Sequence, residues 1–141
     1  PVNMLLDTNI VLDLLMDRTP FSDSAAELFS KVEGGTVIGC LCATTITTIF
    51  YLTAKAVGPA QAQKEIKKLL QLFEIAPVNR TVLESAVGAG FADFEDAVIY
   101  QSACYIGAEA IITRNLKDFS KSKIPVHTAE EMVHTLRLRT L

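Results

Sequence analysis

The segment of residues 2–9 reads VNMLLDTN, a short apolar run that changes abruptly into three polar residues. A continuous apolar run of this length is typical of a strand buried on both faces of a parallel sheet. We therefore predict a buried strand over residues 2–6 that enters a loop at Asp7, Thr8 and Asn9.

Further apolar strand patterns alternate with helical patterns along the rest of the chain. Strands separated by helices favour a parallel sheet covered on both faces, because parallel strands need crossover connections. No internal repeat, linker or low-complexity block divides the sequence, so we predict an α/β fold in a single domain over residues 1–141. The other predicted strands are 36–43, 74–78, 110–113 and 125–127, and the predicted helices are 10–16, 22–32, 44–57, 61–73, 81–87, 94–106 and 129–138.

The composition indicates an ordinary globular chain of 141 residues, with half of the residues apolar and 21% charged. The net charge of −3 gives no basic footprint for nucleic-acid binding, although bound cations could neutralise an acidic site. No apolar run approaches the roughly 18 to 20 residues that span a bilayer. The first residues also lack the basic start of a signal peptide, so we expect a cytoplasmic protein that does not bind membranes.

Carboxylates occur at three points where such a sheet has its ligand-binding crevice, beyond the carboxyl ends of the strands. Asp7 follows the first strand, Asp118 follows the strand that ends at Thr113, and Asp93 and Asp96 stand three apart at the start of a helix. Converging carboxylates stay ionised only beside a cation, and oxygen ligands select Mg²⁺ or Mn²⁺. Such a cation can activate water and stabilise charge on a phosphate, which predicts phosphodiester hydrolysis.

Each acid also has a purely structural interpretation. Asp93 could cap the helix that begins at residue 94, with Asp96 in its first turn interacting favourably with the helix dipole. Asp7 could cap the next helix in the same way, and Asp118 could be an ordinary loop residue. Their occurrence together at three strand ends or helix starts favours a site.

These stretches resemble the PIN domain family, in particular the VapC-like nuclease toxins of bacterial toxin–antitoxin pairs. The resemblance is carried by LLDTNI at 5–10, DLL at 13–15, DFEDA at 93–97, ITRN at 112–115 and KDF at 117–119. It implies a three-layer α/β/α sandwich around a parallel sheet, a carboxylate cluster that holds Mg²⁺ or Mn²⁺, and endoribonuclease activity on single-stranded RNA. Toxin action also implies a cognate antitoxin protein and a homodimer.

The resemblance assigns roles to individual residues by their position in these motifs. Asp7 and Asp96 match metal ligands, Asp118 is implied as a ligand directly or through water, and Asp93 could add a further carboxylate. These four acids are the candidate catalytic residues. The candidate substrate-binding residues are Arg114, expected at the rim of the crevice, together with Thr8, Asn9 and Asn115.

The chain departs from the family at the helix after the second strand, where members commonly carry a Glu. Residues 44–48 contain no carboxylate, and the next one along the chain is Glu65. A hydroxyl is a weaker metal ligand, so affinity should fall unless Asp93 supplies the missing charge. A catalytically degenerate PIN-like module that binds RNA or a partner stays an alternative. An aspartyl-phosphate phosphatase is a second alternative, but it needs an acid where this chain has Asn9.

Overall fold

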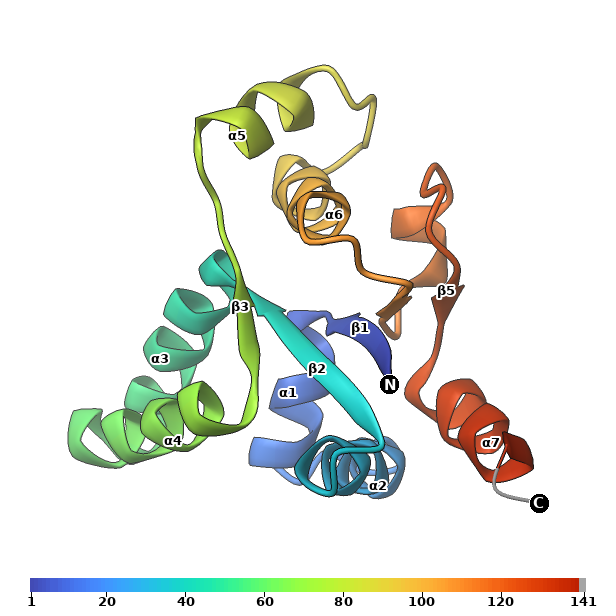
Figure 1. Cartoon of the computed structure of the whole chain (residues 1–141). Helices are drawn as coiled ribbons and strands as arrows, with labels where there is room; N and C mark the ends of the chain where they lie inside the picture. The colour runs from blue at the N-terminus through green and yellow to red at the C-terminus, as the bar shows by residue number, and fades with distance from the viewer. Residues whose placement is uncertain (140–141) are drawn as a thin grey trace.

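The apolar run at residues 2–6 forms the central strand of a five-stranded sheet in the computed structural model, which describes residues 1–139 (Figure 1). Met4, Leu5 and Leu6 are fully buried, as expected for a strand with helices on both faces. All strand pairs are parallel, in the order β3-β2-β1-β4-β5. The strands are β1 (Val2–Leu6), β2 (Val37–Cys42), β3 (Glu74–Ala76), β4 (Ala110–Ile112) and β5 (Val126–His127).

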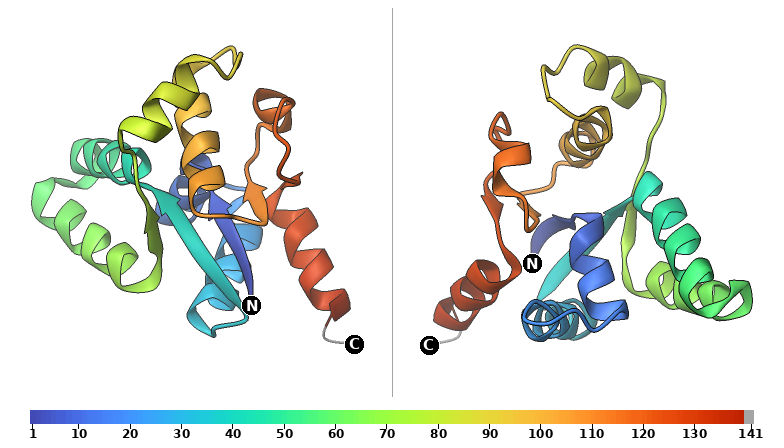
Figure 2. Two further views of the ribbon diagram at one scale, coloured as in Figure 1. Left: turned by 45° about the horizontal axis from the view of Figure 1, so that its top comes forward. Right: turned by 180° about the vertical axis from the view of Figure 1, so that it is seen from behind.

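Helices cover both faces of the sheet and divide the core into two clusters. Met4 and Leu6 point into the larger cluster with the helices α1, α2, α3, α4 and α7, whereas Leu5 points into the smaller cluster with α5 and α6. Figure 1 shows α5 and α6 above the sheet, and both views in Figure 2 show α3 and α4 packed side by side. The helices are α1 (Thr8–Leu15), α2 (Ser22–Glu33), α3 (Ala43–Val57), α4 (Pro59–Leu72), α5 (Arg80–Val87), α6 (Phe94–Tyr105), the 3₁₀ helix η1 (Leu116–Phe119) and α7 (Ala129–Arg139).

This architecture confirms the predicted α/β fold, with three layers around a parallel sheet. Every predicted strand and helix is present, and the boundaries differ by at most two residues. The helix α1 begins earlier than predicted, at Thr8, because Asp7 caps it directly after β1. The helix α4 begins at Pro59 because proline is suited to the first helical position. The short 3₁₀ helix η1 was not predicted. None of the helices over residues 1–139 is long and apolar enough to cross a membrane.

The strand order places a topological switch point between β1 and β4. Along the chain, β2 and β3 add to one side of β1, and then β4 and β5 add to the other side. Sheets of this kind open a crevice at the carboxyl ends of the two strands where the order reverses. Asp7 follows β1 and Thr113 follows β4, so both residues lie at the edge of this crevice.

Gly39 in β2 makes room for a pair of aromatic rings in the larger cluster. The buried ring of Phe73 packs edge-on against Phe29, with ring centroids 5.1 Å apart. A Cβ added at Gly39 would lie 2.6 Å from Cε1 of Phe73 and 2.9 Å from Cγ2 of Val32. A larger residue at this position therefore requires both side chains to move.

We predict that Gly39→Ala lowers the free energy of unfolding by about 1–3 kcal/mol, the usual cost of overpacking a core. Urea denaturation followed by circular dichroism measures this change. Gly88→Ala is the matched control, because no atom lies within 4 Å of a Cβ added there and the backbone φ is −92°. Equal stability of the two variants would contradict the packing argument.

Candidate active site

Asp7 lies at the switch point and connects the end of β1 to the end of β4. It is the N-cap of α1, and its Oδ1 accepts a hydrogen bond from the backbone N–H of Thr8 at 2.8 Å. Its Oδ2 accepts a hydrogen bond from the hydroxyl of Thr113 at 2.7 Å. The residue is only 6% exposed, so both oxygens are held in fixed positions at the floor of the crevice.

The side chain of Asn9 supports the same two residues. Its Nδ2 lies 3.5 Å from Oδ2 of Asp7 and 3.5 Å from Oγ1 of Thr113, while its Oδ1 accepts a weak hydrogen bond from the backbone N–H of Arg114 at 3.4 Å. Thr113 Oγ1 also accepts from the backbone N–H of Asn115 at 3.1 Å. Asn9 therefore holds the loop after β4 against the start of α1.

The structure brings Asp96 close to the other three predicted acids. Burial raises the pKa of Asp96 to about 7, and the negative charges of Asp7, Asp93, Asp118 and Glu95 add to this effect, in that order. The charges named as raising the pKa of Asp96 thus all belong to carboxylates, and they disfavour its ionised form near neutral pH.

Asp7 is subject to the same repulsion but is better stabilised by hydrogen bonds. Burial raises its pKa, the hydrogen bonds from Thr113 and Thr8 lower it, and the charges of Asp118 and Asp93 raise it. The charges of Asp93 and Asp118 thus raise the pKa of both Asp7 and Asp96, as expected for acids that gather at one end of the sheet.

Asp93 both caps α6 and contributes charge to the acidic cluster. It is the N-cap of α6, and its Oδ1 accepts a hydrogen bond from the backbone N–H of Glu95 at 2.7 Å, which confirms the structural interpretation. Asp93 is exposed, as is Asp118 on η1, whereas Asp96 in the first turn of α6 is half-buried. The cluster therefore has Asp7 at its floor and Asp93 and Asp118 toward solvent.

The four carboxylates suit a hard divalent cation, because their donor atoms are oxygens and because they can carry negative charge. Within residues 1–139, no three acidic, histidine or cysteine side chains are grouped tightly enough to hold a metal ion among them. Mg²⁺ does not require such a group, because it commonly keeps several waters and binds through one or two carboxylates. Two carboxylates such as Asp7 and Asp96, in a cluster of uncompensated negative charge, meet that requirement.

The start of α3 carries hydroxyl groups at the place where PIN domain proteins commonly carry a carboxylate. Thr45 is fully buried, and its Oγ1 is 2.9 Å from Oγ1 of Thr8. Thr44 Oγ1 interacts with the sulfur of Cys42 at 3.2 Å. The hydroxyl pair of Thr8 and Thr45 thus joins α1 to α3 and adds no charge to the site.

Arg114 is engaged in an ion-pair cluster that the sequence reasoning did not identify. Its Nε lies 3.0 Å from Oδ2 of Asp13, and the Nε of Arg18 lies 3.1 Å from Oδ1 of the same residue. Its guanidinium carbon also lies 4.2 Å from the ring centroid of Phe21. Asp13 is only 1% exposed; burial raises its pKa, and the two arginines oppose that rise. The sequence feature that could have indicated this ion-pair cluster is Asp13 itself, an acid three residues after Ile10 on the buried face of an apolar helix.

The four predicted substrate-binding residues therefore lie in different environments. Thr8 and Asn9 are bonded within the crevice, Arg114 is 30% exposed and paired, and the side chain of Asn115 is exposed. Contact of any of them with a substrate stays a prediction.

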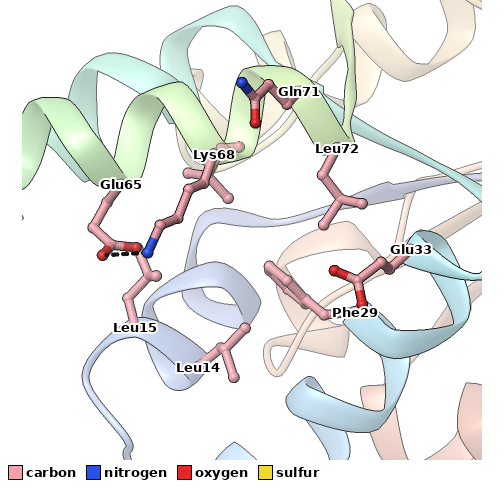
Figure 3. Close-up of a pocket in the computed structure, with 9 residues that line it drawn as sticks. Leu14, Leu15, Phe29, Glu33, Glu65, Lys68, Gln71 and Leu72 are labelled. Carbon is pink, nitrogen blue, oxygen red and sulfur yellow. Dashed lines mark ion pairs between the residues drawn. The ribbon is translucent and has the colours of Figure 1, made fainter.

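Two of the cavities lined by α1 residues differ in their relation to the loop after β4. A cavity of about 300 Å³ lies beside the loop after β4 and is lined by Arg114 and Asn115 among others. A groove of about 350 Å³ lies between α1, α2 and α4, where Phe29 and Leu72 face each other and Lys68 pairs with Glu65 at the rim (Figure 3). That groove shares no residue with the loop after β4, so we assign it no part in the chemistry.

Comparison with known proteins agrees with the resemblance to PIN domains seen in the sequence. The family model described as PIN domain matches residues 3–117. Ribonuclease VapC1 of Aquifex aeolicus is 25% identical to the chain over 133 residues, which cover 91% of each protein. A toxin–antitoxin complex from Klebsiella pneumoniae contains a chain with a TM-score of 0.67 and 26% identity, matched over 89% of this chain and 97% of that one.

Other solved structures share the fold at lower sequence identity. VapBC2 from Rickettsia felis, bound to a promoter DNA fragment, has a TM-score of 0.70 at 15% identity and covers 90% of this chain and 98% of its own. The sarcin–ricin loop cleaving toxin VapC20 of Mycobacterium tuberculosis has a TM-score of 0.61 at 13% identity, over 77% of this chain and 86% of its own.

We predict that Asp96→Asn stabilises the metal-free protein progressively as the pH rises. The pKa of Asp96 is about 7 in the folded state, against about 4 in an unfolded chain. A raised carboxyl pKa favours folding fully only below pH 4, and this contribution is lost as the pH rises through 7. Melting temperatures of wild type and variant in chelator, measured from pH 4 to 8, should therefore diverge in favour of the variant.

The control for this comparison is Glu84→Gln, which removes an exposed acid from α5. Its melting temperature should follow that of the wild type across the pH range. A difference between Asp96→Asn and wild type that is constant from pH 4 to 8 would contradict the proposed repulsion in the cluster.

Proposed function

Because the chain belongs to the PIN domain family, we propose that it is a divalent-metal-dependent endoribonuclease of the toxin type that cleaves single-stranded RNA. The observation that carries this proposal is that burial and the charges of Asp7, Asp93 and Asp118 raise the pKa of Asp96 to about 7, with Asp7 at the switch point of the sheet. The name of the ribonuclease from Aquifex aeolicus, which matches over almost the whole chain, supports the same reaction.

In this proposal, Asp7 and Asp96 hold Mg²⁺ or Mn²⁺, Asp118 joins them directly or through water, and Asp93 adds a fourth carboxylate. When bound, the cation supplies a water of lowered pKa and a counter-charge for the scissile phosphate. Asp7 presents oxygens oriented by the hydrogen bonds from Thr8 and Thr113. Asp96, partly protonated near pH 7 in the metal-free protein, releases its proton on binding the cation.

Asp93 has a particular place in this proposal because residues 44–48 contain no carboxylate. Its charge already acts on both Asp7 and Asp96, so it compensates in part for the missing acid. Asn9 argues against an aspartyl-phosphate mechanism, because a side-chain amide beside Asp7 and Thr113 cannot serve as a general acid. The remaining rival is an RNA-binding or partner-binding module without catalytic activity.

We predict that Asp96→Asn and Asp7→Asn each abolish both metal binding and RNA cleavage. Loss of a group outside the ligand sphere costs roughly 10–100-fold in affinity or activity, and loss of a direct ligand should cost more. Titration calorimetry with Mn²⁺ and Mg²⁺ measures binding, and a single-stranded RNA substrate measures cleavage. Glu84→Gln should behave as wild type. A folded wild-type protein that neither binds millimolar metal nor cleaves RNA would leave the non-catalytic module as the function.

The proposal includes a cognate antitoxin, a homodimer and a cytoplasmic location. Solved structures of similar fold are toxin–antitoxin complexes, which supports the antitoxin. We predict that expression of the chain alone arrests bacterial growth and that the product of a small neighbouring reading frame relieves the arrest and co-purifies with it. Asp96→Asn should not arrest growth, and sedimentation should give the mass of a dimer. Unimpaired growth with an RNA-cleaving protein present would contradict toxin action.

A further inference from the structure

A cavity of about 300 Å³ lies between the loop after β4 and the starts of α2 and α7, and two of its lining residues, Arg114 and Asn115, directly follow Thr113, which bonds to Asp7. Its volume is at the lower end of the roughly 300–1,000 Å³ typical of small-molecule sites, which suits a single ring system. Its lining includes Phe21, Ser24, Arg114, Asn115, Thr128 and Glu130.

We propose that this cavity binds one unstacked nucleobase of the RNA, next to the scissile phosphate; this inference rests on the proposed ribonuclease function. The cavity and the acidic cluster share a short chain segment. Thr113 donates to Asp7 at 2.7 Å and accepts from the backbone N–H of Asn115 at 3.1 Å, and Arg114 and Asn115 both line the cavity. This shared segment is the reason for placing the phosphate of a nucleotide whose base occupies the cavity on the side of Asp7.

The charges around the cavity favour a neutral base over a phosphate group. Arg114 is the positively charged residue among those that line it, and its Nε is 3.0 Å from the buried carboxylate of Asp13. Glu130 also lines the cavity, whereas Asp13 is already paired with both Arg114 and Arg18. A phosphate would therefore compete with Asp13 for Arg114 and be repelled by Glu130, whereas an uncharged ring with polar edges would not.

The lining also provides the two kinds of contact that proteins use to bind a single-stranded base. Unstacked bases pack on aromatic rings and on the flat faces of arginine side chains. Arg114 lies over Phe21 at 4.2 Å, and its ion pair with Asp13 holds it there. Ser24, Asn115 and Thr128 carry hydroxyl and amide groups that can bond to the edge of a base.

The test compares two single-stranded RNA oligonucleotides that differ at the nucleotide beside the cleavage site, which is intact in one and abasic in the other. The wild type should cleave the abasic oligonucleotide about 5- to 150-fold more slowly, the range expected for loss of one stacked base. Ser24→Trp fills the cavity from α2, so it should cleave the intact oligonucleotide at the slower rate and no longer distinguish the two. Ser30→Trp, the same change on the exposed side of α2, should keep the full wild-type difference.

A second variant covers the case in which Ser24→Trp does not fold. Asn115→Ala changes an exposed side chain and should reduce the preference for the intact oligonucleotide without lowering the melting temperature. Equal cleavage of both oligonucleotides by the wild type, or an unchanged preference in both folded variants, would overturn the base site and leave the nuclease function standing.

A direct binding measurement separates failure of the nuclease from failure of the base site. A trinucleotide with a central fluorescent 2-aminopurine should show a saturable change in emission with wild type and with Ser30→Trp, but not with Ser24→Trp. If the wild type cleaves no RNA, the proposed function fails, and this binding signal alone decides the inference. Absence of a signal with the wild type overturns it.

Discussion

The buried carboxylate of Asp7 is the constraint on which the arrangement at the switch point depends. A buried ionised group is costly unless hydrogen bonds or charges compensate it, and here the backbone of α1 and the hydroxyl of Thr113 do so. Satisfying this one group fixes where α1 begins and holds the end of β1 against the end of β4. Asn9 bonds to both Asp7 and Thr113, and the backbone N–H of Asn115 bonds to Thr113. These bonds hold the loop after β4 in place.

Asp13 and Asp96 both have raised pKa values, but the charges around them are of opposite sign. Asp13 is almost completely buried and has two guanidinium groups at 3.0 and 3.1 Å. Asp96 has only other carboxylates among the charges that act on it. The first arrangement is self-sufficient and holds α1 to the loop after β4. The second raises the pKa of its acid instead of stabilising the charge, and a pKa perturbed in this way by burial and by like charges is more typical of a functional site than of a structural ion pair.

The strands, helices and strand-end acids were predictable because they depend on local patterns. Apolar runs buried on both faces identified the strands, and the polar residues directly after them identified Asp7 and the region of Thr113. The partners of Asp13 were not predictable in this way, because Arg18 and Arg114 reach it from different parts of the chain. The engagement of Arg114 by Asp13 and Phe21, and the cavity beside it, depend on packing that no sequence period encodes.

The central position of β1 has a consequence for the order in which a ribosome makes the molecule. Asp7 leaves the ribosome 106 residues before Thr113, whose hydroxyl bonds to it. Until β4 has been made, β1 lacks its β4 neighbour, and the four acids cannot meet because Asp118 comes after β4. A nascent chain therefore keeps the acids of the candidate site apart, and their mutual repulsion is complete only after Asp118 has joined them.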